Sequence, residues 1–167
     1  MTERIRAAPS KTAAEQVAPT AAGERGSRRH RVRHAGVLYS LVALGSMIGG
    51  LLRASASLVV HAYMGSGFPW GTMFVNVTGS FAIGFYATLS EPEGRLLAGS
   101  YQRQFIMTGI FGGYTTFSIF SLETFALAQA GALSTAGLNV GVSVAGWLAA
   151  VWLGHTAATG FNRLKGF

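Results

Sequence analysis

The chain has 167 residues, of which 50% are hydrophobic and only 11% are charged, and it contains no cysteine. Soluble domains carry about 25% charged residues, so this composition argues against a soluble enzyme. The lack of cysteine excludes disulfides and thiolate metal sites. The formal net charge is +7, and its uneven distribution along the chain carries more information than its sum.

The beginning of the chain is basic and polar. Eight of the 13 Lys and Arg residues lie within the first 33 positions, together with Pro9 and Pro19 and without any apolar period. We therefore predict a disordered basic cytoplasmic tail over 1–34, and no cleaved signal peptide. Basic residues placed in this way are typical of a membrane surface or topology signal, and we expect no nucleic-acid partner.

Four hydrophobic segments follow, over 35–61, 69–89, 101–127 and 135–161. Each is long enough to span a bilayer, which takes about 20 helical residues for about 30 Å of hydrocarbon. The connections are short and leave no soluble domain for an enzyme. We predict an all-α membrane protein in the cell membrane, with four transmembrane helices forming one domain over 35–163. The last four residues, 164–167, are expected to form a short C-terminal tail.

The third segment contains a stretch that is poor helix material, GIFGGYTTFSIFS at 109–121. Its adjacent glycines and its adjacent threonines, Thr115 and Thr116, both disfavour a continuous helix. We predict a helix broken in the middle, because such breaks persist in membranes only where protein, ions or water satisfy the freed backbone groups. A packing kink with two lipid-facing rings, Phe117 and Phe120, is the alternative interpretation.

Two polar stripes run along otherwise apolar segments. Thr72, Asn76 and Ser80 share one face of the second segment, and Asn139 and Ser143 share one face of the fourth. An asparagine amide is costly in lipid and should face protein or water. Its two N–H donors suit a small passing anion. A hydrogen bond that only stabilises the helix bundle is the alternative interpretation.

Small residues and one arginine mark further contacts. The pairs Gly45–Gly49 and Gly137–Gly141 predict close approach between helices. With so little interior in one four-helix subunit, we also expect an oligomer. Arg53 is a charge within the first segment, and we expect it at a vestibule or an interface.

The tryptophans and two histidines do not suggest a site. We interpret Trp70, Trp147 and Trp152 as interface or packing aromatics. His61 and His155 have no metal-ligand pattern around them. We therefore assign none of these side chains to an ion path.

Three motifs lie along the hydrophobic segments: GGLLR at 49–53, PWGTMFVN with GSF at 69–81, and GIFGGYTTFSIFSLE at 109–123. With these motifs the chain resembles the Fluc (CrcB) family of fluoride channels, and the resemblance covers about 38–161. It implies a dimer of antiparallel four-helix subunits that passively exports cytoplasmic fluoride and so lowers its toxic accumulation. It implies a channel and no enzyme activity.

The resemblance also implies the residues of the ion pathway. The family's pore asparagine matches Asn76, and its two pathway rings match Phe117 and Phe120, whose positive edges can approach an anion. The other implied pathway residues are Thr72, Thr116, Glu123 and Ser143. Asn139 stands where the family often has tyrosine, which leaves the pathway lining on that side open.

A structural sodium ion that is not transported is a further implication of the resemblance. In the family, backbone carbonyls at the helix break hold this ion, and the matching positions are Gly112 and Thr115. Hard cations prefer oxygen ligands, and an unwound helix can supply them.

Two other function classes remain open. A small four-helix dimeric multidrug or cation antiporter needs a carboxylate embedded early in the chain, but the first two segments contain no Asp or Glu. A structural subunit of a larger membrane complex is the second alternative. Fluoride efflux from liposomes would separate all three.

Charge also predicts orientation. Four crossings place both termini and the loop over 90–100 on one side of the membrane. Besides the tail, the basic residues of that side are Arg95, Arg103, Arg163 and Lys165. The other side has at most Arg53, so the positive-inside rule predicts cytoplasmic termini. A chain with such a strong charge bias should not insert in both orientations in similar amounts. We therefore favour a heterodimer, in which the second subunit is a different chain of opposite orientation, over a dual-topology homodimer.

Overall fold

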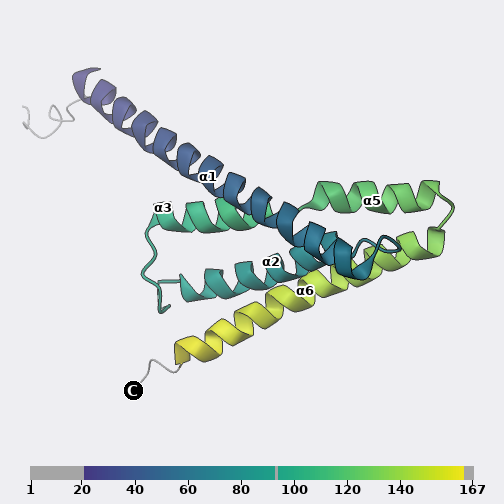
Figure 1. Ribbon diagram of the computed structural model, residues 1–167. Helices are drawn as coiled ribbons and strands as arrows, with labels where there is room; N and C mark the ends of the chain where they lie inside the picture. Colours follow the sequence, from purple (N-terminus) through teal and green to yellow (C-terminus); the bar gives the residue numbers. More distant parts are fainter. Residues whose placement is uncertain (1–20, 93, 164–167) are drawn as a thin grey trace, which may run out of the picture. The chain divides into compact units, whose positions relative to one another are not determined.

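The computed structural model describes residues 21–92 and 94–163, and the elements within them are helical (Figure 1). In chain order these are α1 (Ala21–Met64), α2 (Trp70–Leu89), α3 (Ser100–Arg103), η1 (Gln104–Phe111), α4 (Gly112–Tyr114), α5 (Phe117–Gln129) and α6 (Leu133–Arg163). Four stretches of the described chain are long and apolar enough to cross a membrane: Arg31–Met64, Trp70–Leu89, Ser100–Gln129 and Leu133–Arg163. The predicted all-α class with four membrane-crossing helices is confirmed.

The chain divides into two units, 1–37 and 38–167. The described part of the first unit is helical from Ala21 onward, so the tail that we predicted as disordered over 1–34 overlaps the beginning of α1. Its first 20 residues and the predicted C-terminal tail lie outside the described residues.

The third crossing is broken, as the sequence predicts. Thr115 and Thr116 have extended backbone angles, with ψ of 158° and 125°, and they separate α4 from α5. The sequence did not predict the wide-turned π-helix η1 that precedes the break, between α3 and α4. Wide turns of this kind occur mostly as single-turn insertions within α-helices, and they are frequent at functional sites.

α2 and α6 lie side by side within the second unit (Figure 1). The two helices approach closely because each has a glycine that lies against the backbone of the other. A Cβ atom added at Gly84 would collide with the carbonyl of Val151, and one added at Gly154 would collide with the carbonyl of Phe81. This pairing fixes the helix that carries Asn76 against the helix that carries Ser143.

Only one of the two predicted glycine pairs makes a close contact within the chain. A Cβ at Gly45 would lie 2.8 Å from Gly109 Cα, and one at Gly49 would collide with the carbonyl of Ile110. α1 therefore packs closely against the first half of the third crossing. Gly137 and Gly141 have no atom of the described chain within 4 Å of such a Cβ, so that pair makes no close helix contact among the described residues.

Candidate functional site

Asn76 bridges the break in the third crossing. Its Nδ2 donates to the Thr116 carbonyl at 2.8 Å, and its Oδ1 accepts from the Thr116 amide at 2.7 Å. Both residues are buried. The asparagine side chain thus takes the place of the helical acceptor that the Thr116 amide loses at the break, which is the support that broken membrane helices require.

The same break diverts two amides away from carbonyls that a continuous helix would pair. The Thr116 amide would bond the Gly112 carbonyl in an α-helix, but it bonds Asn76. The Ile119 amide would bond the Thr115 carbonyl, but it donates to Thr116 Oγ1 at 3.2 Å as an N-cap contact. The carbonyls of Gly112 and Thr115 are therefore released from their helical donors. Carbonyl oxygens released in this way are the kind of ligand that a hard cation prefers.

A cavity of about 320 Å³ lies beside the break. Its lining includes Gly112, Thr115 and Thr116 from the break and Asn76 and Ser80 from α2. Ile83, Phe117 and Trp147 complete the lining. The described residues that line it carry no charged side chain, so any ion inside meets hydrogen-bond donors, carbonyls and ring edges.

Three aromatic rings contact one another in series, and the outer two, Phe117 and Trp147, line this cavity. Phe117 and Phe120 have centroids 5.6 Å apart, and Phe120 meets Trp147 at 4.8 Å in an edge-on arrangement of 75°. Phe117 is 71% exposed in the single chain, whereas Phe120 is 6% exposed. The two phenylalanines that were predicted on one face therefore lie in different surroundings. Phe120 packs between Phe117 and Trp147 of α6.

The polar stripe of α6 bonds to α5. Asn139 Nδ2 donates to Thr124 Oγ1 at 2.8 Å, and Ser143 Oγ donates to Asn139 Oδ1 at 3.3 Å. Asn139 and Ser143 are each 1% exposed. Thr124 also donates to the Phe120 carbonyl at 2.8 Å, so this network ends at a predicted pathway residue. Ser143 does not line the cavity beside the break.

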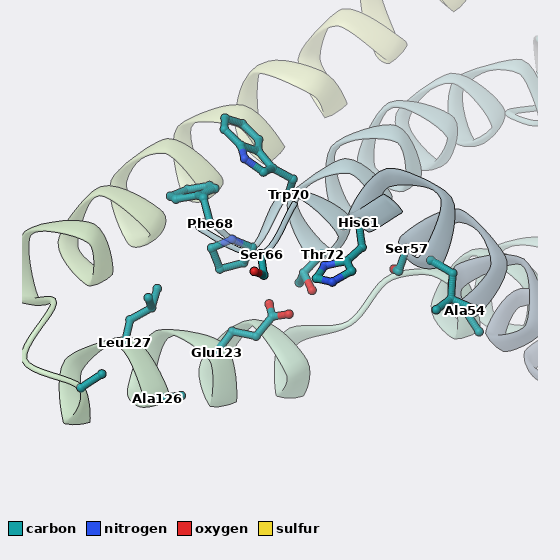
Figure 2. A pocket seen from close by; sticks show the side chains of 14 residues that line it. Ala54, Ser57, His61, Ser66, Phe68, Trp70, Thr72, Glu123, Ala126 and Leu127 are labelled. Atoms are coloured by element: carbon teal, nitrogen blue, oxygen red, sulfur yellow. The ribbon is translucent and has the colours of Figure 1, made fainter. Parts of the chain in front are cut away.

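A larger cavity, of about 680 Å³, lies between α1, α2, α5 and the α1–α2 loop. Figure 2 shows the Glu123 side chain of α5 pointing across it toward Ser66, with Thr72 and His61 on the facing side. Glu123 Oε2 is buried and has no hydrogen-bond partner in the described chain. Thr72 and Asn76 lie one turn apart on α2, so the two cavities open on the same face of that helix.

The structure thus separates the predicted site residues into groups. One cavity brings together Asn76, Thr116, Phe117, Gly112 and Thr115, and the other brings together Thr72 and Glu123. Phe120 and Ser143 lie behind the first cavity, among the aromatic and amide contacts described above. Arg53 is partly exposed and lines neither cavity.

Comparison with known proteins shows the family. A model of the family described as CrcB-like protein, Camphor Resistance (CrcB), matches residues 40–155. The chain belongs to this family. It is 58% identical over 135 residues to the protein named Fluoride-specific ion channel FluC 1 of Rhodopseudomonas palustris (strain BisB18), across 81% of this chain and 96% of that relative. It is 54% identical over 129 residues to Fluoride-specific ion channel FluC of Opitutus terrae, across 77% and 98%. It is 57% identical over 125 residues to the protein of the same name from Paramagnetospirillum magneticum, across 75% and 98%.

Membership of the CrcB family and the four apolar helices make this chain a multi-pass membrane protein. Of the residues that line the cavity beside the break, Ser80, Ile83 and Trp147 did not enter the sequence-based prediction as site residues, and two of these, Ser80 and Trp147, have a polar side-chain atom. A signal for both was present. Ser80 continues the stripe of Asn76, and Trp147 follows Ser143 by one helical turn and so shares its face.

Proposed function

We propose that this chain forms a fluoride channel, which lets cytoplasmic fluoride leave the cell passively and so limits its toxic accumulation. The observation that carries the proposal is the buried Asn76, whose amide is fixed against the break beside an uncharged cavity. The names of the CrcB relatives, at 54% and 58% identity, support fluoride as the ion.

The proposed pathway follows the face of α2 that borders both cavities. Fluoride enters or leaves by the larger cavity at Thr72 and Glu123, and it passes Asn76 and the rings of Phe117 and Phe120. One Nδ2 hydrogen of Asn76 is used on Thr116, which leaves the second for the ion. Weak neutral donors suit conduction, because an ion bound too strongly does not leave.

Other residues hold the residues of this path in position. Thr116 fixes Asn76, and Ser143 acts through Asn139 and Thr124 on the segment that carries Phe120. In our proposal Arg53 lies at a vestibule or a subunit interface, where its positive charge raises the local concentration of anions.

A structural sodium ion at the break completes the proposal. The released carbonyls of Gly112 and Thr115 are its proposed ligands. A bound cation would stabilise the broken backbone and lower the free-energy cost of placing an anion nearby. It would not itself be transported. Phe117 is largely exposed in the single chain, which supports a second, antiparallel subunit that covers it.

Efflux from liposomes tests the function directly. Liposomes loaded with potassium fluoride and containing the protein should release fluoride to an electrode once a potassium ionophore balances the charge. Chloride-loaded liposomes are the control, and a proton gradient or added cationic drugs should not change the rate. Release no faster than from protein-free liposomes would contradict the channel proposal, and release driven by a proton gradient would favour the antiporter.

A further inference from the structure

Tyr114 makes a hydrogen bond to α2 from the position directly before the break in the third crossing. It is the last residue of α4, and its hydroxyl oxygen lies 3.0 Å from Thr78 Oγ1. The hydroxyl of Thr78 has a single hydrogen, which it donates to the Phe74 carbonyl at 2.7 Å. Tyr114 is therefore the donor of the bond between the two hydroxyls, and Thr78 accepts it.

The ring of Tyr114 packs where α2 has no side chain. A Cβ atom added at the buried Gly79 would lie 3.2 Å from Tyr114 Cδ1, and it would collide with the methyl group of Thr115. The ring is thus already held against α2 by packing. Its hydroxyl therefore loses little further conformational freedom when it bonds to Thr78.

Two polar contacts from α2 hold the break on both of its sides. Asn76 bonds the amide and the carbonyl of Thr116, and Thr78 accepts from Tyr114. Asn76 and Thr78 are two positions apart on one continuous helix, so their separation is fixed. The two contacts together therefore restrain the extended backbone at Thr115, which lies between the two residues that they hold.

The carbonyls released at the break belong to this restrained segment. Gly112 is two residues before Tyr114, and Thr115 directly follows it. Carbonyls without helical donors can take several arrangements if their backbone is free to move. A ligand that binds one arrangement only has its apparent affinity reduced in proportion to the population of that arrangement. A contact that fixes the backbone should therefore raise the affinity for an ion bound by these carbonyls.

We propose that Tyr114 is a positioning residue for the structural sodium ion and acts through its bond to Thr78. The bond keeps the backbone around the break in the arrangement that the ion binds. It raises the apparent affinity for sodium, although the phenol itself does not contact the ion. The role in sodium binding rests on the proposed function, whereas the bond itself is present in the structure.

Sodium-dependent thermal stability tests this role without a transport assay. The aggregation temperature of the detergent-solubilised protein is measured against sodium concentration, with a large organic cation keeping the ionic strength constant. Tyr114→Phe keeps the ring against Gly79 but removes the donor. We expect it to raise the half-saturating sodium concentration about threefold to tenfold, as for the loss of one neutral hydrogen bond. A bond with a merely structural role would lower the aggregation temperature but leave the half-saturating concentration unchanged.

Thr78→Val removes the acceptor of the same bond. It should raise the half-saturating sodium concentration by a similar factor, so the test does not depend on the folding of one variant. The double variant of Tyr114→Phe and Thr78→Val should shift the concentration no further than either single change, because all three remove one interaction.

Tyr86→Phe is the matched control. The ring of Tyr86 also joins α2 to the third crossing, with its centroid 6.2 Å from that of Phe111 in an edge-on arrangement. Its hydroxyl oxygen, however, is buried and has no partner within the described residues. Removing this hydroxyl should leave the half-saturating sodium concentration unchanged.

The outcomes separate the positioning role from the proposed function. If sodium stabilises the unmodified chain and Tyr114→Phe keeps its half-saturating concentration, Tyr114 has no positioning role and the sodium ion stands. No sodium-specific stabilisation of the unmodified chain would overturn this role together with the sodium ion, and liposome efflux would still decide the channel function. If Tyr114→Phe shifts the sodium dependence but the unmodified chain passes no fluoride, the positioning role stands and the proposed channel function fails.

Discussion

Asn76 and Thr116 lie 40 positions apart in the chain and are joined by two hydrogen bonds, of 2.8 and 2.7 Å, between one side-chain amide and one peptide unit. The pair connects α2 to the point where the third crossing breaks. Asn76 therefore has two roles in our proposal, because it holds the break and offers its remaining N–H to the ion. Changes at this residue should affect stability and flux together.

Asn76→Asp should nearly abolish fluoride efflux and also destabilise the protein. A carboxylate cannot donate to the Thr116 carbonyl, and losing this buried hydrogen bond costs about 0.5–1.5 kcal/mol. The new negative charge also repels an anion, by about 4 kcal/mol at 4 Å in a medium of intermediate dielectric. Liposome efflux and the temperature at which the detergent-solubilised protein aggregates measure the two effects.

Asn162 offers a matched control for this change. Its side chain also joins two backbone groups, accepting from the Arg95 amide at 3.1 Å and donating to the Thr88 carbonyl at 3.2 Å. Asn162→Asp should cost comparable stability but leave efflux near that of the unmodified protein, because Asn162 lines neither cavity. Equal efflux from both variants would remove Asn76 from the pathway.

Phe120→Ile should reduce efflux while the protein stays folded. Isoleucine keeps much of the volume but loses the ring edge and the contacts with Phe117 and Trp147, each worth about 1 kcal/mol. Phe125→Ile is the control, since Phe125 lies on the same helix and is 60% exposed. Unchanged efflux from Phe120→Ile, in protein shown to be intact by size-exclusion chromatography, would contradict a role for the ring.

The two glycines of the break should respond differently to alanine. A Cβ at Gly113 would lie 2.8 Å from Ser46 Cα, whereas one at Gly112 would meet only the Met107 carbonyl, at 3.7 Å. Gly113→Ala should separate α1 from the third crossing and lower the yield of folded protein. Gly112→Ala should fold normally. Equal yields of folded protein from the two variants would show that α1 and the third crossing can move apart to accept the extra methyl group at Gly113.

Sodium should be needed for activity but should not flow. If the carbonyls of Gly112 and Thr115 hold a sodium ion, prolonged dialysis into a large organic cation should lower fluoride efflux, and returning sodium should restore it. Thr115→Ser should leave this dependence intact, because the proposed ligand is the backbone. Full efflux after rigorous removal of sodium would count against a required ion.

Orientation in the membrane should be fixed by the basic residues. We propose that both termini are cytoplasmic and that the second subunit is a different chain inserted the opposite way. A reporter fused after Phe167 should then be active only in its cytoplasmic form, and fluoride efflux should need co-expression of the second chain. Comparable cytoplasmic and periplasmic signals from this chain alone would instead support a dual-topology homodimer.

The sequence by itself determined the four crossings and the position of the break. Both depend on local properties, namely the length of apolar runs and the poor helix propensity of adjacent glycines and of Thr115 and Thr116. It also placed Asn76 on a polar face of α2, because residues four apart on a helix share a face. These predictions needed no knowledge of which helices are neighbours.

Only the tertiary structure decided which groups meet. The pairing of Asn76 with Thr116 releases the carbonyl of Gly112, and no local pattern specifies a partner 40 positions away. Close approach at Gly45, but not at Gly137, likewise depends on which helix lies opposite.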